Sequence, residues 1–331
     1  MLFALLSLFC LLVIASGQDP TTAQSALCSS GETILTRERQ SVNGPPPRHM
    51  PKNLQWAYTR CGASAVEDFF IDDNRGGKGT HYSHTRGDIA ARVAASVGEL
   101  ESARVAPARR FIDAPLMARV ARALVDPAVA ARLARPGSTA VVFGSAAPAV
   151  EALLIAAGVS RVITIEYNNL TYAHEQIVTA RPSDVEAAWA AAAATADYKS
   201  PLGSPGSYDV ALSISSFDHD GLGRYGDPLA PDGDLMSMAD VARYLRPDGL
   251  ALIAVPIGLD VIWWNLMREY GPVRLPLLID AAHWRVLGRI GWAEERLGRP
   301  RDLKKGVGRP WEPLWILEPL PKPEGDSDPD L

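Results

Sequence analysis

The sequence predicts an α/β protein built on a doubly wound, mostly parallel β-sheet. Between residues 138 and 256, short β-branched apolar segments alternate with segments of helical periodicity. The first of these strands ends in a tight glycine turn, and the second ends on a carboxylate. In such sheets ligands bind at the carboxyl ends of the strands. The 331 residues, 47% of them hydrophobic and 21% charged, suffice for a large folded core.

The first strand–helix–strand unit begins at Ser138. The segment "TAVVFGS" is typical of a buried strand that stops at Gly144. In the helix that follows, Pro148 fits the first turn and Gly158 the C-terminal exit. The segment "RVITIEYN" then predicts a strand ending at Glu166. In nucleotide-binding sheets, an acid about 20 residues after the glycine turn reaches the ribose hydroxyls, and Glu166 lies close to that distance after Gly144. Alternatively, Glu166 could cap the next helix.

The turn after the first strand reads "GSAAP" and has one glycine where a dinucleotide-binding fingerprint needs three. NAD and FAD are therefore disfavoured. Gly144, with the small Ser145 and two alanines after it, still permits close approach by a ligand that lacks a pyrophosphate. The methionine portion of S-adenosylmethionine is such a ligand, which makes it the cofactor that this turn favours.

The alternation continues through three further strands. "QIVTARP" predicts the third strand, and Asp184 after it could accept from an adenine amino group or cap the helix that starts there. "YDVALSISS" predicts the fourth strand, "DLMSMADVARYL" a helix, and "LALIAVP" the fifth strand.

The segment "LRPDGLALIAVP" resembles the one that follows the fourth strand in class I S-adenosylmethionine-dependent methyltransferases. More specifically, "SISSFDHDGLGRYGDPLAPDGD", "AVPIGLDVIWWNLMREYGPVRLPLL" and "WEPLWIL" together resemble a small family of unknown function first defined on Caenorhabditis proteins. The resemblance covers residues 139–318. It implies a Rossmann-like sheet whose last two strands, "WRVLGRIGW" and "PLWILEP", form an antiparallel edge hairpin.

The same resemblance implies roles for four residues but carries no established activity. Gly144 would approach the cofactor, Glu166 would hold its ribose, Asp184 would lie near its base, and Asp218 would face the substrate from the end of the fourth strand.

The loop "SFDHDGLGRYGDP", residues 216–228, follows the fourth strand and contains the candidate catalytic residues Asp218, His219 and Asp220. An imidazole titrates near neutrality, so His219 could act as general base on a hydroxyl substrate, oriented by Asp218 or Asp220. Arg224 and Tyr225 could hold an anionic or sugar-like substrate.

Two alternatives remain for this loop. Its aspartates Asp218, Asp220 and Asp227, with His219, could collect a hard divalent cation. The loop could also be a polar turn in which side chains satisfy backbone amides and the glycines supply positive φ.

Further along, "DVIWWNLMREYGPVRLP" adds Arg268 and Arg274 as candidate substrate contacts, with surface salt bridges as the alternative for Arg274. The adjacent Trp263 and Trp264 are expected on a helix, pointing to different sides.

The chain is expected to have four parts. Residues 1–17 resemble a signal peptide, or a signal anchor, followed by an N-terminal extension and linker over 18–110 that is helical or irregular. Within that extension, residues 72–88 predict a loop. The α/β domain spans 111–318, where Pro127 divides two covering helices, and the acidic tail 319–331 is expected to be disordered.

The leader places the protein in the secretory pathway, in the ER or Golgi lumen or outside the cell. Cys28 and Cys61 are an even pair in that oxidising compartment and could form a disulfide. "NLT", beginning at Asn169, is a glycosylation acceptor. The net charge of -5 with dispersed basic residues argues against nucleic acid as a partner, and no membrane contact is expected beyond the possible anchor.

These observations predict a methyltransferase that uses S-adenosylmethionine to modify a hydroxyl or carboxyl of a glycan or small molecule. The alternatives are a non-catalytic methyltransferase-like binding protein and a metal-assisted nucleotide-sugar glycosyltransferase.

Overall fold

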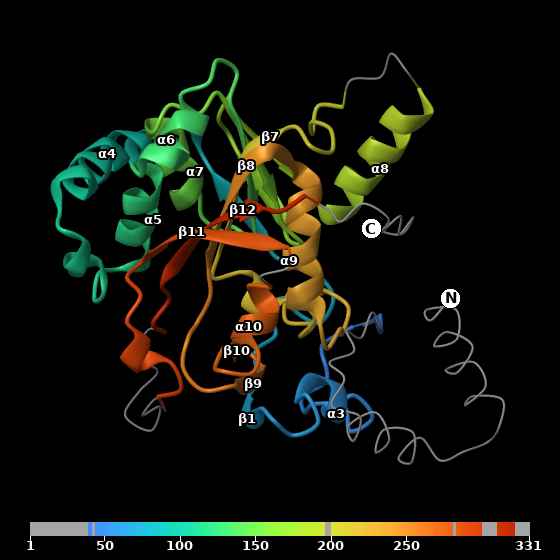
Figure 1. Cartoon of the computed structure of the whole chain (residues 1–331). Helices are drawn as coiled ribbons and strands as arrows, with labels where there is room; N and C mark the ends of the chain where they lie inside the picture. Colours follow the sequence, from blue (N-terminus) through green and yellow to red (C-terminus); the bar gives the residue numbers. More distant parts are fainter. Residues whose placement is uncertain (1–38, 42–43, 196–199, 281–282, 300–309, 322–331) are drawn as a thin grey trace.

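A seven-stranded β-sheet runs through the middle of the protein, with the strand order β11-β12-β8-β7-β3-β4-β6 (Figure 1). The structure is a computed structural model that describes residues 39–41, 44–195, 200–280, 283–299 and 310–321. The expected leader, Cys28 and most of the acidic tail lie outside these ranges.

The strands of this sheet match the apolar segments identified in the sequence. They are β3 (Thr139–Phe143), β4 (Arg161–Ile165), β6 (Ile177–Ala180), β7 (Tyr208–Ile214), β8 (Leu245–Ala254), β11 (Trp284–Ile290) and β12 (Leu314–Pro319). From β6 to β8 all neighbours are parallel, whereas β12 is antiparallel to both β8 and β11. The predicted doubly wound α/β sheet with an antiparallel edge hairpin is therefore confirmed.

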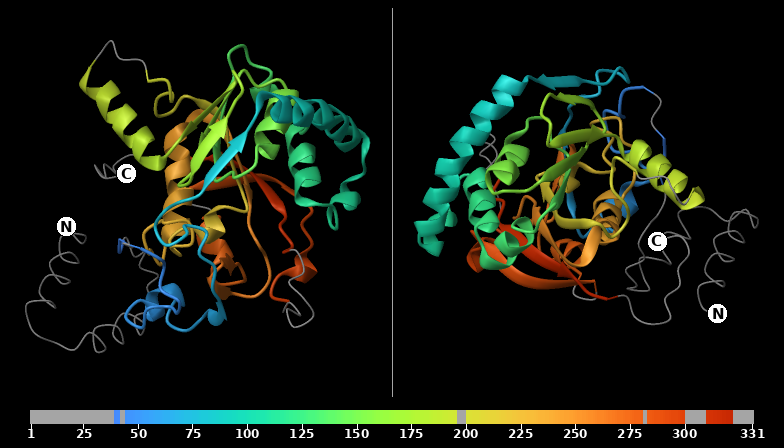
Figure 2. Two further views of the ribbon diagram at one scale, coloured as in Figure 1. Left: turned by 180° about the vertical axis from the view of Figure 1, so that it is seen from behind. Right: turned by 90° about the horizontal axis from the view of Figure 1, so that it is seen from above.

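Helices cover both faces of the sheet, as the views in Figures 1 and 2 show. One face carries α4 (Arg86–Val105), α5 (Leu116–Leu124), α6 (Pro127–Leu133) and α7 (Ala149–Ala156), and the other carries α8 (Pro182–Ala194) and α9 (Gly233–Tyr244). Alternate residues of β3 enter the two cores: Val142 packs with the first group of helices and Val141 with the second. Burial on both faces explains why these strands are continuously apolar.

The N-terminal extension contributes to the same structure. In α4, Ile89, Leu100 and Ala103 are buried in the core that α7 also lines, so the expected boundary at residue 110 does not separate two cores. Residues predicted as a loop contain β2 (His81–His84), which pairs in parallel with β5 (Asn169–Tyr172). Such pairings between distant segments leave no local signal in so short a strand.

A second, three-stranded sheet lies beside the carboxyl-terminal half of the domain. It combines β1 (Ala65–Phe69) with β9 (Val261–Asn265) and β10 (Met267–Glu269), near the short helices α3 (Gln55–Tyr58) and α10 (Leu275–Leu278) (Figure 1). The helix expected at Trp263 and Trp264 is wrong, because both lie in β9. Strand alternation still separates them, and Trp264 is the fully buried one.

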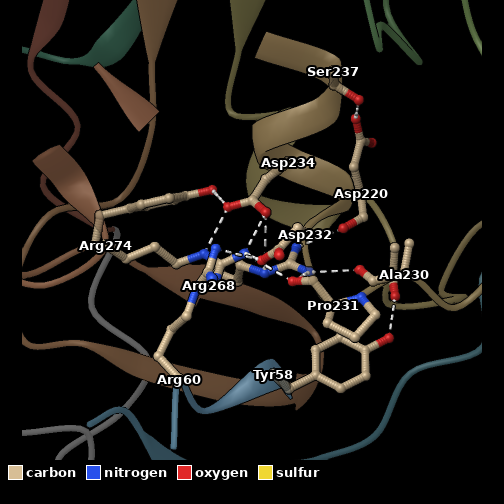
Figure 3. Close-up of polar contacts among 12 residues, drawn as sticks. Tyr58, Arg60, Asp220, Ala230, Pro231, Asp232, Asp234, Ser237, Arg268 and Arg274 are labelled. Carbon is tan, nitrogen blue, oxygen red and sulfur yellow. Dashed lines mark hydrogen bonds and ion pairs between the residues drawn. The ribbon is translucent and has the colours of Figure 1, made fainter. Parts of the chain in front are cut away.

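A buried ionic network joins this small sheet to α9 (Figure 3). Arg274 donates to Asp234 from Nε at 2.8 Å and from Nη2 at 2.5 Å, and Arg268 Nε lies 3.6 Å from the same carboxylate. Tyr270 also donates to Asp234, at 2.8 Å. Arg60, which follows α3, reaches Asp232 at 2.7 Å. Burial would raise the pKa of Asp234, but the charges of Arg268 and Arg274 outweigh it and hold that pKa below its usual range.

Two further facts bear on the chain's environment. Cys61 is disulfide-bonded, and the partner predicted for it, Cys28, lies outside the described residues. In the part of the chain that the structure describes, no helix combines the length and apolar character needed to cross a membrane.

Because the network is buried, losing one of its ion pairs should lower the free energy of unfolding much more than losing an exposed ion pair. Replacing Arg274 with alanine should lower the free energy of unfolding by about 3–5 kcal/mol, because Asp234 then remains buried with its main partner removed. The control is Arg285→Ala, which removes an exposed pair with Glu318 and should cost less than about 1 kcal/mol. Urea denaturation measures both, and equal costs would contradict a structural role for the network.

Candidate functional site

A cavity of about 820 Å³ opens at the carboxyl ends of β3, β4 and β7. Its wall includes Gly144 and Ser145 after β3, Glu166 after β4, and His219 and Asp220 after β7. This is where an open parallel sheet binds ligands, and the volume lies within the range of about 300–1,000 Å³ usual for small-molecule sites. Three predicted parts of the site therefore share one cavity.

Gly144 allows the ends of these strands to converge. Its φ is +68°, and a Cβ there would lie 1.9 Å from Ser216 Oγ and 3.8 Å from Glu166 Oε2. A larger residue would collide with the side chain that follows β7. The glycine is thus required first by contact within the protein, and its backbone also forms part of the cavity wall.

Glu166 follows β4 and lines the cavity, and Asn168 holds one of its carboxylate oxygens. Its Oε1 accepts from the backbone N–H of Asn168 at 3.1 Å and from the Asn168 amide at 3.2 Å. Burial raises the pKa of Glu166, and these hydrogen bonds oppose that effect. Its Oε2 lies near Gly144, so the acid is placed to accept hydrogen bonds from a ligand held between the two strands.

Ser145 and Asp184 make protein contacts instead of presenting free polar groups. Ser145 Oγ lies 3.0 Å from the carbonyl of Ala147 and 3.2 Å from Glu151 Oε2. Asp184 accepts the backbone N–H of Arg181 at 2.9 Å and thereby caps α8. It does not line the cavity, so the capping alternative holds and the base-binding role predicted for Asp184 is not supported.

Asp218 and His219 form a close pair with Asp218 behind the cavity wall. Asp218 is completely buried, its carboxylate oxygens accept no hydrogen bond, and Oδ2 lies 3.5 Å from His219 Nε2. Burial raises the pKa of Asp218 to about 7. His219 lines the cavity while Asp218 does not, so the substrate-facing position expected for Asp218 is not observed.

His219 is a neutral imidazole in this setting. Its Nδ1 lies 2.6 Å from the carbonyl oxygen of Leu266, a contact that requires the proton to sit on Nδ1. Burial, helped by the charge of Arg224, lowers the pKa of His219 to about 4. With Nδ1 on a carbonyl and Nε2 facing Asp218, the ring is poorly arranged to be the general base that the sequence predicted.

Asp220 is better arranged for proton transfer. It lines the cavity, and its Oδ2 accepts from Ser237 Oγ at 2.5 Å (Figure 3). Burial raises the pKa of Asp220 well above its ordinary value. A buried carboxyl with raised basicity and a fixed orientation is what general-base catalysis needs.

Three of the four predicted substrate contacts are engaged elsewhere. Arg224 donates to Asp73 at 2.7 Å, while Arg268 and Arg274 are buried in the ionic network and donate to backbone carbonyls of residues 220, 230 and 231. None of the three arginines lines the cavity, whereas Tyr225 does. The sequence could not show that these arginines are engaged, because their partners Asp73, Asp232 and Asp234 lie far from them in the chain.

The metal alternative for this loop is not supported. Asp227 accepts the backbone N–H groups of Gly221, Gly223 and Tyr225, at 2.8, 3.0 and 3.1 Å. Its carboxylate therefore shapes the turn, as the polar-turn alternative proposed. Among the described residues, no three His, Cys, Asp or Glu side chains converge in a way that could hold a metal ion.

Several cavity residues were missed by the sequence analysis. Ser215 leaves β7 with φ +54°, a strained conformation for a residue with a side chain. It lines the cavity together with Ser216, Tyr167, Asn168 and Arg243. The sequence signal for these residues was their place in the dipeptides "YN" and "SS", close to the ends of β4 and β7. Residues at the carboxyl ends of parallel strands lie where such a sheet binds ligands. Asn169, the possible glycosylation site, is exposed in β5 and outside the cavity wall.

Residues 137–288 match the family described as "Caenorhabditis protein of unknown function, DUF268". No curated protein matches the chain.

Solved structures with a similar fold include three methyltransferases. The 1,6-didemethyltoxoflavin-N1-methyltransferase of Burkholderia thailandensis, solved with 1,6-didemethyltoxoflavin and S-adenosylhomocysteine, is 19% identical, with a TM-score of 0.38 over 71% of this chain and 90% of that one. A SAM-dependent methyltransferase of Leishmania major is 16% identical, with a TM-score of 0.31 over 67% and 83%. An S-adenosylmethionine-dependent methyltransferase of Mesorhizobium loti is 11% identical, with a TM-score of 0.35 over 62% and 99%.

Identities this low speak only to the type of fold, which the strand order already defines. Residues 137–288 match the family first described on Caenorhabditis proteins, and they lie within the doubly wound, mostly parallel α/β fold that the resemblance in the sequence implied.

Proposed function

We propose that this protein is an S-adenosylmethionine-dependent methyltransferase that acts on a hydroxyl or carboxyl group of a glycan or small molecule in the secretory pathway. The observation that carries the proposal is the single cavity in which Gly144 and Glu166 meet His219 and Asp220 at the carboxyl ends of adjacent strands. Cofactor-side and acceptor-side residues are thus within one space.

The charges on the cavity wall favour this cofactor over a nucleotide sugar. Four acids line the cavity, Glu166, Glu186, Asp220 and Asp240, against the arginines Arg39 and Arg243. A sulfonium cation is attracted by such a wall, whereas the diphosphate of a nucleotide sugar is repelled by it. The wall therefore favours methyl transfer over glycosyl transfer.

The residues present fit S-adenosylmethionine in a limited set of roles. Glu166 would accept from its ribose hydroxyls, and the turn beginning at Gly144 would lie against its methionine portion. When bound, the cofactor supplies an electrophilic methyl group. Asp220 would remove the proton from an acceptor hydroxyl, with Ser237 holding the carboxylate in place. His219 would contribute a neutral polar surface, and Tyr225 an aromatic one for a sugar ring or small molecule.

Two features support the proposed compartment. The apolar leader over residues 1–17 predicts entry into the secretory pathway, and the disulfide at Cys61 is compatible with an oxidising lumen. A glycan on the exposed Asn169 would extend from β5 and not from the cavity wall, so glycosylation there is compatible with activity.

Calorimetric titration with S-adenosylhomocysteine tests the cofactor. The lumenal protein should bind it, and Glu166→Ala should weaken binding by about 10–100-fold, because a charge-assisted hydrogen bond contributes about 1.5–3 kcal/mol. Asp184→Ala is the matched control: it should leave affinity unchanged while lowering the free energy of unfolding by about 1 kcal/mol through loss of the helix cap. Absence of binding heat at millimolar ligand would remove the cofactor from the proposal.

The variant Asp220→Asn tests whether the protein is a methyltransferase or a non-catalytic binding protein. With radiolabelled S-adenosylmethionine and a panel of saccharides and small hydroxy and carboxylic acids, the wild type should transfer label and the variant should not, although both bind S-adenosylhomocysteine. Because the pKa of Asp220 is raised, the base is protonated and inactive at low pH, so turnover should increase as pH rises through that pKa. Equal label transfer by wild type and variant would contradict this role, and cofactor binding without any transfer would favour the non-catalytic alternative.

A further inference from the structure

Glu151 is a buried acid that the proposed reaction does not use. It lies in the first turn of α7, immediately behind the turn that follows β3, and no part of it is exposed. Thr164 Oγ1, from β4, donates to Glu151 Oε1 at 2.8 Å, and Glu151 Oε2 lies 3.2 Å from Ser145 Oγ. The carboxyl group thus connects β4 to the turn after β3, which lines the cavity.

The hydrogen bonds around Glu151 reveal its protonation state. Three oxygen–oxygen contacts form a chain: Thr164 to Glu151, Glu151 to Ser145, and Ser145 to the carbonyl of Ala147 at 3.0 Å. Each contact needs one hydrogen. The two hydroxyl groups supply two, and a protonated Glu151 would supply the third. As a carboxylic acid it donates to Ser145, which then donates to Ala147, and every contact is satisfied.

Among the residues that the structure describes, no cation acts on the pKa of Glu151. Burial raises that pKa to about 7, and only hydrogen bonds, including those with Thr164 and Ser145, lower it. Glu151 raises the pKa of Tyr172 of β5, on which Glu166, which follows β4, and Arg92 of α4 also act. Neutral Glu151 is therefore consistent with both the contacts and the surroundings.

Through Ser145 this acid reaches the proposed cofactor site. The Ser145 carbonyl accepts from the Tyr172 hydroxyl at 2.6 Å, and its backbone N–H lowers the pKa of Glu166 by hydrogen bonding. Ser145 is therefore held on three sides, by Tyr172, Glu166 and Glu151. Loss of the proton on Glu151 would leave three contacts with two hydrogens and put a charge behind the turn.

We propose that Glu151, as a neutral carboxylic acid, is a positioning residue that holds the turn from Gly144 to Pro148 in the shape that receives the cofactor. The identity of that ligand rests on the function proposed above. The role of the proton in holding the turn does not.

The first test measures S-adenosylhomocysteine binding at about pH 6 and about pH 8. Wild-type affinity should fall about tenfold between them, as a binding form that loses its proton near pH 7 requires. Glu151→Gln keeps a donor and an acceptor without ionising, so it should bind as the wild type does at the lower pH and lose this fall. Glu151→Ala should bind weakly at both. Glu101→Gln, on the exposed face of α4, should behave as wild type.

The second test needs no ligand. Because the pKa of Glu151 is raised on folding, its contribution to stability is complete below about pH 4.5 and is lost as pH rises to about 7. Relative to Glu151→Gln, the wild-type unfolding constant should increase by about two orders of magnitude over that window.

The outcomes separate the two proposals. If wild-type protein binds no S-adenosylhomocysteine at either pH, the proposed function fails, and the unfolding profiles still decide the role of Glu151. Parallel profiles for wild type and Glu151→Gln, or equal loss of binding in the glutamine and alanine variants, would overturn that role. Should Glu151→Ala not fold, the comparison of wild type with Glu151→Gln remains decisive.

Discussion

The contact between Asp234 and its two arginine partners is the interaction on which the rest of the site depends. Asp234 lies in the first turn of α9, which packs on the main sheet, whereas Arg268 and Arg274 belong to the small second sheet and to the segment after it. All three side chains are buried. Buried charges are stable only with their partners in place, so the two parts of the domain can adopt few relative positions.

The loop after β7 is held by this contact. Arg268 donates to the carbonyl oxygens of Asp220, Ala230 and Pro231. These contacts fix both ends of the loop that connects η2 (Phe217–His219) to α9. Within this loop, Asp227 accepts hydrogen bonds from three backbone N–H groups. Gly221 packs so closely that a Cβ there would lie 2.1 Å from the carbonyl oxygen of Ala230. The loop is therefore both a tightly built turn and a cavity wall, because the same framework that bends it presents His219, Asp220 and Tyr225 inward.

The N-terminal extension supports the same wall from outside. β1 adds to β9, Arg60 binds Asp232, and Asp73 binds Arg224, which in turn stacks on Tyr225 at 4.8 Å. Residues far apart in the chain thus stabilise one cavity edge. On the opposite edge, Glu151 and Tyr172 hold Ser145 from behind. The polar residues of the cavity therefore depend on a surrounding shell of buried hydrogen bonds, which makes their orientation specific.

The sequence by itself determined the main sheet, because strands buried on both faces must be continuously apolar and helices between them must carry a periodic apolar face. It also located the edge of the sheet at which the cavity opens, since Gly144, Glu166 and Asp220 each follow a recognisable strand. Only the tertiary structure decided which polar residues face the cavity. Arg268, Arg274 and Asp218 are charged as Asp220 is, yet contacts with other parts of the chain bury them completely, whereas Asp220 lines the cavity. The partner of a buried charge, and the hydrogens available to a buried acid such as Glu151, are set by contacts between segments, and local residue patterns do not encode them.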